Sequence, residues 1–511
     1  MMNPRTFLST FPRDAVAGTV VFLVALPLCL GIANASGVEP FAGLVSGIIG
    51  GLVVALLSGS PLSVSGPAAG LVVIVVDGIA QLGGFPAFLL AVALSGLLQL
   101  GLGLLRAGRL AAYVPSPVIK GMLAAIGLLL IVKQVPFALG LHGGTAPFSA
   151  HALAAAALAL ASLALLVAWD SGALRRFALV RNVPAPLVVV VLGIAVTLAL
   201  DALAPAFAPP AEHRVALPAL DSLAALDGAL ANIEFGPHFA QLWNPAVWRV
   251  AITLAIVASL ETLLSLEAVE QIDPKRRAPL PDRELKAQGI GNLVAGVVGG
   301  LPITSVIVRS SVNVHAGAQS RISAVVHGVL LLASVFLLTE LINLIPLATL
   351  AAILIHTGFK LAKPALFAAV ARQGPAAFAP FVATIAGVLA IDLLAGIGLG
   401  IVCSVLAVAL ANLRNPATLA RHDDHYLLTF RKDVSFLGKV RVKHDLRQIP
   451  DGAVVIIDAT RADYLDHDVR ELIDAFVAEA PARGISVDYR QPARSRDGSW
   501  RFGALRSPAP Q

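Results

Sequence analysis

Charged residues and cysteines are scarce in this chain of 511 residues. Asp, Glu, Lys and Arg together make up 13% of it, and its two cysteines, Cys29 and Cys403, both lie in apolar segments. Two such cysteines provide neither a disulfide framework nor a metal-ligand spacing, so we expect them to be small packing residues. The sequence also lacks a Gly-x-Ser-x-Gly elbow, a Walker P-loop and a His-Glu-x-x-His motif. We therefore predict that the protein is not an enzyme and needs no cofactor.

Apolar residues make up most of the chain. They account for 57% of the sequence, and the mean hydropathy is +0.83. A water-soluble chain of this length could not bury so much apolar surface. Many uncharged runs, such as Ala15 to Val38, approach the roughly 20 residues that a helix needs to cross a bilayer. These features predict an all-α, polytopic membrane protein.

We expect fourteen membrane segments, as two sets of seven, in a transporter domain of residues 14–414. The first repeat covers about 14–202 and the second about 246–414. The segments that begin near Gly66 and Ile303 are too short or too broken to cross alone as plain helices, and irregular backbone at membrane depth must be buried or line a cavity. The expected segments begin near Ala15, Phe41, Gly66, Pro86, Pro117, Ala152, Pro184, Ala246, Ala287, Ile303, Ile322, Pro346, Phe378 and Gly396.

Basic residues indicate the orientation of these segments. An even number of segments places both termini on one side, and many basic residues fall on that side with them. The long loop 203–244 carries acidic residues and falls on the other side. The positive-inside rule then predicts that both termini, including residues 1–13, are cytoplasmic. The net charge of +6 therefore reflects topology, and we expect no nucleic-acid partner. The basic residues are Arg5, Arg13, Arg106, Arg109, Arg175, Arg176, Arg181, Lys275, Arg276, Arg277, Lys360, Lys363 and Arg414.

After Asn415 the composition becomes polar and charged. We expect a small cytoplasmic α/β domain over residues 415–492. Residues 493–511 are rich in Arg, Ser and Pro, a composition typical of a disordered tail. The predicted elements of the domain are strands at 426–430, 453–458 and 485–489 and an amphipathic helix at 468–480.

Two glycine- and proline-rich breaks interrupt the apolar segments at matching places in the two halves. One lies at 61–70 and the other at 301–311. Transporters built from repeats place their substrate at such interrupted helices. The spacings Gly47-xxx-Gly51 and Gly296-xxx-Gly300, just before the breaks, suit close helix packing.

The breaks have the composition of an anion site. We expect half-helices to begin near Gly66 and Ser305, with their N-terminal ends facing one spot. Unpaired N–H groups and the positive ends of two helix dipoles would meet an anion there. Small residues at the breaks allow a compact anion to approach the backbone. The residues that supply hydroxyl donors or close approach are Ser63, Ser65, Gly66, Ala68, Ala69, Thr304 and Ser305.

Two charged side chains fall within apolar segments. Glu261 is costly at membrane depth, which by default marks an ion or proton site, and Ser265 follows one turn later as an oxygen ligand. Such oxygen ligands suit Na⁺ or H⁺, and the sequence does not decide between them. Alternatively, Glu261 only pairs with a neighbour to hold helices together. Arg309 attracts the anion, pairs with Glu261, or extends to the cytoplasmic boundary.

Several motifs are specific to one family. They are the runs Ser65-Gly66-Pro67, Ser259-Leu260-Glu261-Thr262-Leu263-Leu264-Ser265, Gln288-Gly289-Ile290-Gly291-Asn292-Leu293, Gly299-Gly300-Leu301-Pro302-Ile303-Thr304-Ser305 and Arg309-Ser310-Ser311-Val312-Asn313. With them the chain resembles the sulfate permease (SulP) family of inorganic anion transporters over nearly its whole length. The runs 454–458 and 464–468 resemble a STAS domain. The resemblance implies inverted repeats with core and gate domains, a homodimer and an elevator-like movement.

The resemblance also implies roles for individual residues. Glu261 takes the coupling-cation position, with Ser265 as its hydroxyl neighbour, and Arg309 matches an arginine of the tenth segment. Ala68, Ala69, Ser305 and Val306 take positions around the anion. The chain departs from the family at Leu28, where many members have a glutamine, and at His467 and Asp468, where many STAS domains carry Ser or Thr.

The leading functional hypothesis is a secondary active, cation-coupled transporter of a small oxyanion in a bacterial-type inner membrane. Residues 304–311 resemble a subgroup associated with carbonic anhydrase, so bicarbonate joins sulfate as a candidate substrate and carbonic anhydrase becomes a candidate partner. The alternatives are a passive anion channel, a chloride/bicarbonate exchanger and a STAS-based sensor. Glu261 argues against the channel, because a lone carboxylate beside a pore repels anions.

Overall fold

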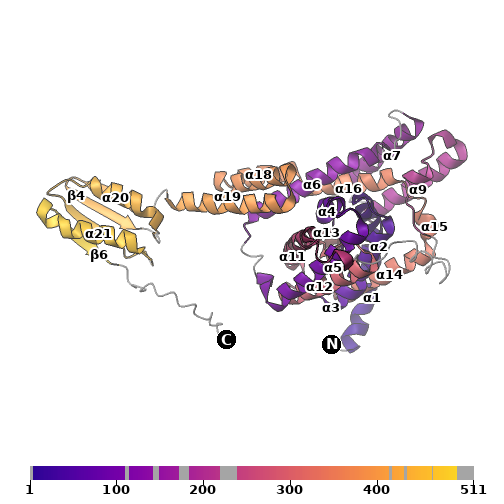
Figure 1. Cartoon of the computed structure of the whole chain (residues 1–511), viewed down its shortest axis with the longest axis horizontal. Coiled ribbons are helices and arrows are strands. Elements are labelled where there is room, and N and C mark those ends of the chain that lie inside the picture. Colours follow the sequence, from indigo (N-terminus) through magenta and orange to yellow (C-terminus); the bar gives the residue numbers. More distant parts are fainter. Residues whose placement is uncertain are drawn as a thin grey trace. The chain divides into compact units, whose positions relative to one another are not determined.

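The computed structural model describes residues 4–109, 114–141, 149–171, 183–218, 239–413, 417–430, 434, 436–462 and 464–491 (Figure 1). The tail expected at 493–511 lies outside these residues. The chain divides into two compact units. The first contains residues 1–372 and 381–401, and the second contains residues 373–380 and 402–511.

The first unit is helical. Several of its helices have a proline in the first turn, where the missing N–H group costs no hydrogen bond. The helices up to residue 203 are α1 (Pro4–Ala35), α2 (Pro40–Ile49), α3 (Ala55–Leu57), α4 (Val72–Leu82), α5 (Phe85–Leu104), α6 (Ser116–Ala138), α7 (Ala150–Asp170) and α9 (Ala185–Leu203). The later ones are α11 (Pro245–Ile272), α12 (Pro281–Val298), α13 (Ile307–His315), α14 (Ile322–Leu337), α15 (Thr339–Ile342), α16 (Leu347–Leu361), α17 (Pro364–Ala371), α18 (Pro375–Ala390) and α19 (Leu393–Leu413), the last two being shared with the second unit.

Each of the fourteen expected segments corresponds to one helix of the structure. Within the described part of the chain, nine helices are long and apolar enough to cross a membrane, and three more are shorter but apolar. The starts differ in places. Helix α1 already begins at Pro4, and α12 begins at Pro281 rather than near Ala287, because Pro281 supplies a helix start ahead of the apolar run. The sequence analysis also did not predict the short helices α15 and α17.

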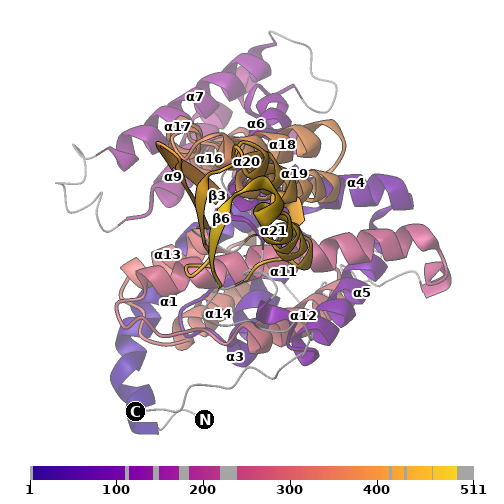
Figure 2. The same ribbon diagram turned by 90° about the vertical axis from the view of Figure 1, so that its left-hand side faces the viewer.

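The helices of the first unit form two bundles, which Figure 2 separates. In the core bundle α1 packs against α2 and α14, and α5 packs against α11 and α12. In the gate bundle α16 packs against α6 and α7, and α7 packs against α9. Gly121 of α6 lies against residues 381–384 of α18, which places that part of α18 in the gate bundle.

Glycine faces hold the core bundle together. On α5 and α12, Gly96 and Gly289 face each other's helix backbone so closely that a β-carbon on either would overlap backbone atoms. Gly296 lies equally close to Ala93, and Gly51 to Gly328 of α14. The packing predicted for the Gly47-xxx-Gly51 and Gly296-xxx-Gly300 spacings is therefore confirmed at Gly51 and Gly296. Between Gly50 and Val54 the second segment forms a π-helical turn that joins α2 to α3.

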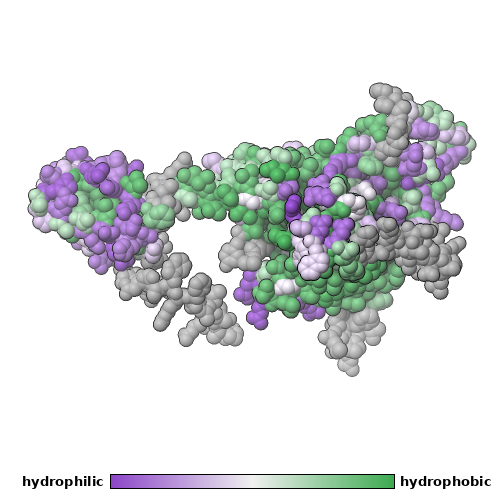
Figure 3. Space-filling model, in the orientation of Figure 1, coloured by the Kyte–Doolittle hydropathy of each residue, from purple (hydrophilic) through white to green (hydrophobic). Residues whose placement is uncertain are grey.

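The second unit contains the expected α/β domain. Its sheet has the order β3-β4-β5-β6, with β3 antiparallel to β4 and the other neighbours parallel. Buried apolar residues of the sheet and of α21 form its core, and hydrophilic residues predominate on its visible surface (Figure 3). The three predicted strands and the helix are confirmed, whereas β3 and α20 were not predicted. The elements are β3 (Ala417–His422), β4 (His425–Phe430), α20 (Lys439–Arg447), β5 (Val454–Asp458), α21 (His467–Glu479) and β6 (Ser486–Arg490).

Candidate anion and cation site

The two breaks meet as a pair of short antiparallel strands. Strand β1 (Ser65–Pro67) pairs with β2 (Ile303–Ser305), and Ser65 lies opposite Ser305 in the register. Backbone at membrane depth must satisfy its hydrogen bonds within the protein. Here the backbone groups of each break bond to those of the other break. Segments some 240 residues apart in sequence are thereby joined, and they pack against α2, α11 and α12 of the core bundle.

The half-helices begin later than the sequence suggested. The expected starts near Gly66 and Ser305 are wrong, because those residues are extended and belong to β1 and β2. One half-helix begins with a 3-10 turn at Ala69–Leu71 and continues as α4, and the other is α13, which begins at Ile307. The N-cap residues are Ala68 and Val306, both extended, and neither has a side chain that can accept a hydrogen bond from the first turn.

In this arrangement no N-cap side chain bonds to the first-turn N–H groups of the two half-helices, so these groups can meet an anion. The positive ends of both helix dipoles lie next to one strand pair. Ala69 and Val306 are partly exposed, whereas the strand residues beside them are buried. The open side of the paired breaks is therefore lined by small or apolar side chains and backbone.

Hydroxyl groups of the strands are held by neighbouring helices. Ser65 Oγ accepts a hydrogen bond of 2.7 Å from Gln288 Nε2 on α12. Ser305 Oγ lies 3.2 Å from Ser265 Oγ on α11, and the Ser305 N–H donates to Thr262 Oγ1, also at 3.2 Å. Thr304 is fully buried, and its hydroxyl has no hydrogen-bond partner. Ser63 bonds to Ser60 Oγ instead.

Glu261 lies beside the first turn of the half-helix that contains α4. A β-carbon at Gly70 would lie 2.7 Å from Glu261 Oε1. Its Oε2 is buried and has no hydrogen-bond partner. A partly exposed carboxylate with one buried, unpartnered oxygen, and with the Thr262 and Ser265 hydroxyls on the same helix, fits a hard cation or a proton. Ser265 contacts Ser305, so it connects α11, the helix that carries Glu261, to the strand of the second break.

Arg309 lies inside the core bundle behind β1. It is fully buried, and its Nη2 donates to the Pro67 carbonyl at 3.2 Å. Its Nη1 lies against Gly66, where a β-carbon would overlap it. Among the ion pairs between described residues, none joins Arg309 to Glu261. Arg309 thus lies against β1 and is fully buried there, away from the partly exposed side of the paired breaks.

Several polar residues of this region had no role assigned from the sequence, although three of them lie in the family motifs. Gln288 and Asn292 of α12, Gln99 of α5 and Thr262 of α11 are all buried and contact the breaks or each other. The signal was present as a polar stripe on α12, since Glu284, Gln288 and Asn292 are spaced four residues apart.

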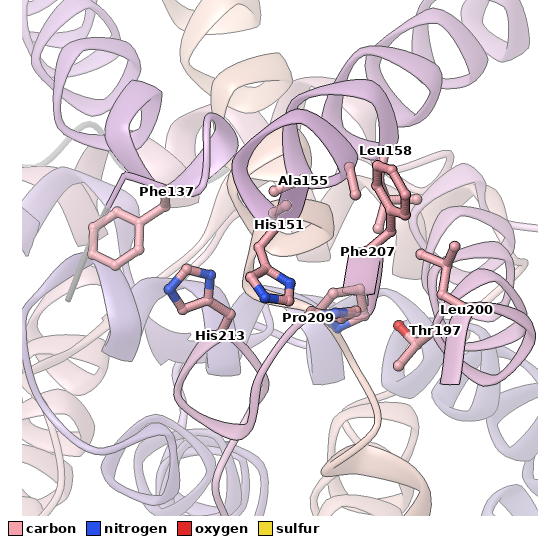
Figure 4. A pocket seen from close by; sticks show the side chains of 12 residues that line it. Phe137, His151, Ala155, Leu158, Thr197, Leu200, Phe207, Pro209 and His213 are labelled. Atoms are coloured by element: carbon pink, nitrogen blue, oxygen red, sulfur yellow. The ribbon is translucent and has the colours of Figure 1, made fainter. Parts of the chain in front are cut away.

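A separate cavity lies in the gate bundle (Figure 4). Its walls come from α6, α7, α9, α16 and the chain that follows α9, and they are mostly apolar. None of the expected anion or cation residues lines it. His151 Nδ1, at its wall, bonds to the Ala208 carbonyl at 2.8 Å. The polar side chains and helix ends that suit an anion are therefore at the paired breaks.

The chain is similar to known anion transporters. Residues 11–384 match the model of the sulfate permease family. A putative sulfate transporter of Bacillus subtilis, YvdB, is 27% identical over 454 residues, which cover 84% of this chain and 79% of that protein. The bicarbonate transporter BicA of a Picosynechococcus strain is 25% identical over 441 residues, covering 81% and 74% of the two chains.

Solved structures show the same fold. The structure of SLC26A9 has a TM-score of 0.72 with this chain at 16% identity, and the match covers 94% of this chain and 84% of that one. The transmembrane domain of a cyanobacterial BicA has a TM-score of 0.60 at 24% identity, with 78% and 97% covered. At these identities the likeness concerns the fold.

Proposed function

Because the chain belongs to the sulfate permease family, we propose that it carries a small inorganic oxyanion, bicarbonate or sulfate, across a bacterial inner membrane. It is a multi-pass membrane protein and a transporter rather than an enzyme. The observation that carries the proposal is the pair of half-helix N-terminal ends joined by β1 and β2. We infer that the anion binds on their open side, at Ser65, Gly66, Ala68, Ala69, Thr304, Ser305 and Val306.

The substrate proposal rests on the size and charge of this site. The partly exposed residues at the two helix ends are Ala69 and Val306, whose short side chains leave room for a compact anion beside the backbone. The relatives named above are described as transporters of sulfate and of bicarbonate. Both are compact oxyanions with acceptor oxygens for backbone N–H groups, and we favour bicarbonate.

We further propose that transport is coupled to a cation at Glu261. The Glu261 side chain is partly exposed, and its Oε2 is buried with no hydrogen-bond partner. A cation or proton bound there would neutralise it, and would attract an anion to the neighbouring helix ends. Na⁺ and H⁺ both fit these oxygen ligands. In this proposal the core bundle moves against the gate bundle as an elevator in a homodimer, both termini are cytoplasmic, and carbonic anhydrase is a partner.

Uptake into proteoliposomes tests the proposal. The purified full chain should accumulate labelled bicarbonate, sulfate or both when an inward Na⁺ or H⁺ gradient is imposed, with chloride as a comparison anion. Single-channel currents without a gradient requirement would instead identify a channel. Loss of all activity on deletion of the chain after Asn415 would favour the sensor, since a transporter should keep its binding site.

A further inference from the structure

Three side chains of α13 face the backbone of the first break. Arg309 Nη2 donates to the Pro67 carbonyl at 3.2 Å, Ser310 Oγ accepts from the Val64 N–H at 2.9 Å, and Asn313 Nδ2 donates to the Leu62 carbonyl at 2.9 Å. The two segments run in opposite directions, so the partners are met in order along the chain. All three side chains are fully buried.

Ser310 also joins the two breaks to each other. Its hydroxyl donates to the Val306 carbonyl at 2.8 Å while it accepts from Val64. The Val306 N–H in turn donates to the Val64 carbonyl at 3.0 Å. These bonds extend the β1–β2 pairing by one residue beyond Ser65 and Ser305, up to the N-cap of α13.

The second break is held from another helix. Asn292 of α12 bonds to both backbone groups of Ile303, accepting from its N–H at 2.6 Å and donating to its carbonyl at 3.0 Å. Each break is therefore fixed by side chains of a neighbouring helix. Gln288 also reaches across to the first break, where it donates to the Ser65 hydroxyl, whereas the three side chains of α13 bond to the backbone of that break.

The position of Arg309 fits a bond to backbone better than a bond to a transported ion. Its guanidinium is enclosed by β1, with Gly66 against Nη1, and by the Cys29 side of α1. None of the described carboxylates forms an ion pair with it. A charged donor to a carbonyl is a strong hydrogen bond in a buried setting, and its loss leaves that carbonyl unsatisfied.

We propose that Arg309, Ser310 and Asn313 form one clamp that fixes the backbone of residues 62–67, so that Arg309 is a positioning residue and does not bind the anion. The clamp sets where the half-helix that begins at Ala69 points relative to α13. This inference rests on the proposed anion site, because positioning matters only if an anion binds beside β1 and β2.

Hydrogen exchange of the full-length protein tests the clamp without any transport assay. In Ser310→Ala, Asn313→Ala and Arg309→Met, amides of residues 62–71 should exchange about fivefold faster or more, the factor expected for a lost buried hydrogen bond. The matched control is Ser311→Ala, which removes the same atom from the next residue, whose hydroxyl contacts His315 instead. Unchanged exchange in Ser310→Ala and Asn313→Ala would overturn the clamp. If Arg309→Met does not fold, Ser310→Ala and Asn313→Ala, compared with Ser311→Ala, still decide whether the clamp exists.

Transport then separates a clamp from a direct charge. A charge that touches the anion acts about twice as strongly on divalent sulfate as on monovalent bicarbonate, because Coulomb energy scales with charge. The clamp predicts that Arg309→Met and Asn313→Ala lower the uptake rate by similar factors, with an unchanged ratio of sulfate to bicarbonate half-saturation concentrations. A ratio that rises in Arg309→Met alone would overturn it. If the unmodified protein carries neither anion, the proposed function fails, and the exchange measurement still decides the clamp.

Discussion

The Glu261 carboxylate lies against Gly70, so close that a β-carbon at residue 70 would stand 2.7 Å from Oε1. Gly70 belongs to the first turn of the half-helix that, in our proposal, meets the anion. Gly70 therefore lies between the proposed cation site and the proposed anion site, and forms a wall that the two sites share. Movement of either the carboxylate or the turn must affect the other.

Gly70→Ala should weaken the dependence of uptake on the cation gradient. The added methyl group displaces the end of the Glu261 side chain, which is flexible, so the fold should survive. Uptake measured against Na⁺ concentration and against pH would show a shifted cation half-saturation point. Gly101→Ala is the matched control, since a β-carbon there meets open space. Identical cation dependence in Gly70→Ala and in the control would contradict the shared wall.

Glu261→Gln should uncouple transport from the cation. Glutamine keeps the shape of the side chain but carries no charge and cannot bind a proton or Na⁺ as a carboxylate does. Uptake should lose its response to the imposed Na⁺ or H⁺ gradient while the protein keeps its oligomeric state on size exclusion. If the variant keeps its full gradient response, the coupling ion binds elsewhere.

Ser305→Ala should weaken the apparent affinity for the anion about fivefold. In our proposal the Ser305 hydroxyl, which lies 3.2 Å from Ser265 Oγ, donates to the anion, and the loss of that hydrogen bond costs on the order of 1 kcal/mol. Competition of unlabelled anion against labelled uptake measures the change. Ser63→Ala is the control, because that hydroxyl contacts Ser60 outside the strand pair. Equal effects of the two changes would argue against a site at Ser305.

The two breaks that the structure pairs could be predicted from the sequence, but the way they pair could not. The glycine and proline breaks and the isolated Glu261 were visible because each violates the apolar pattern of a membrane helix. The pairing of β1 with β2 was not, because three-residue strands have no detectable period and their partner lies in the other repeat. The position of Arg309 could not be predicted either. A sequence shows that a charged residue follows the break, but it does not show on which side of the strand that side chain lies.

Polar residues on α12 show a second limit of the sequence. Glu284, Gln288 and Asn292 repeat at helical spacing, which alone suits a water-exposed stripe as well as a buried one. In the structure Glu284 accepts from Ser58 Oγ at 2.5 Å and from Gln288 Nε2 at 3.0 Å, so the stripe is buried. Only the fold shows that it supports β1 and β2.

Asp273, directly after α11, should make stability depend on pH. Burial alone would raise the pKa of Asp273, but the hydrogen bonds and charge of Arg277 and the N–H group of Lys275 outweigh it and hold the pKa below its ordinary value. A lowered folded-state pKa gives stability that is present above about pH 4, the unfolded value, and is lost as pH falls through the folded value.

Thermal unfolding of Asp273→Asn in detergent checks this dependence. The variant should unfold at a lower temperature than the unmodified protein at pH 7, and the difference should shrink below about pH 4. Glu267→Gln, an exposed acid on the same helix, should change neither. Equal unfolding temperatures of Asp273→Asn and the unmodified protein at pH 7 would show that the Arg277 pair contributes nothing.

If the transported anion binds on the open side of the paired breaks, as we propose, Ala69→Leu should block that site. Ala69 is partly exposed at the first turn of the half-helix, so a leucine there should fill the site. Ala80→Leu adds the same side chain at an exposed position on α4. In proteoliposomes with matched protein content, Ala69→Leu should abolish uptake of labelled bicarbonate and sulfate, whereas Ala80→Leu should retain it. Full uptake by Ala69→Leu would contradict the account.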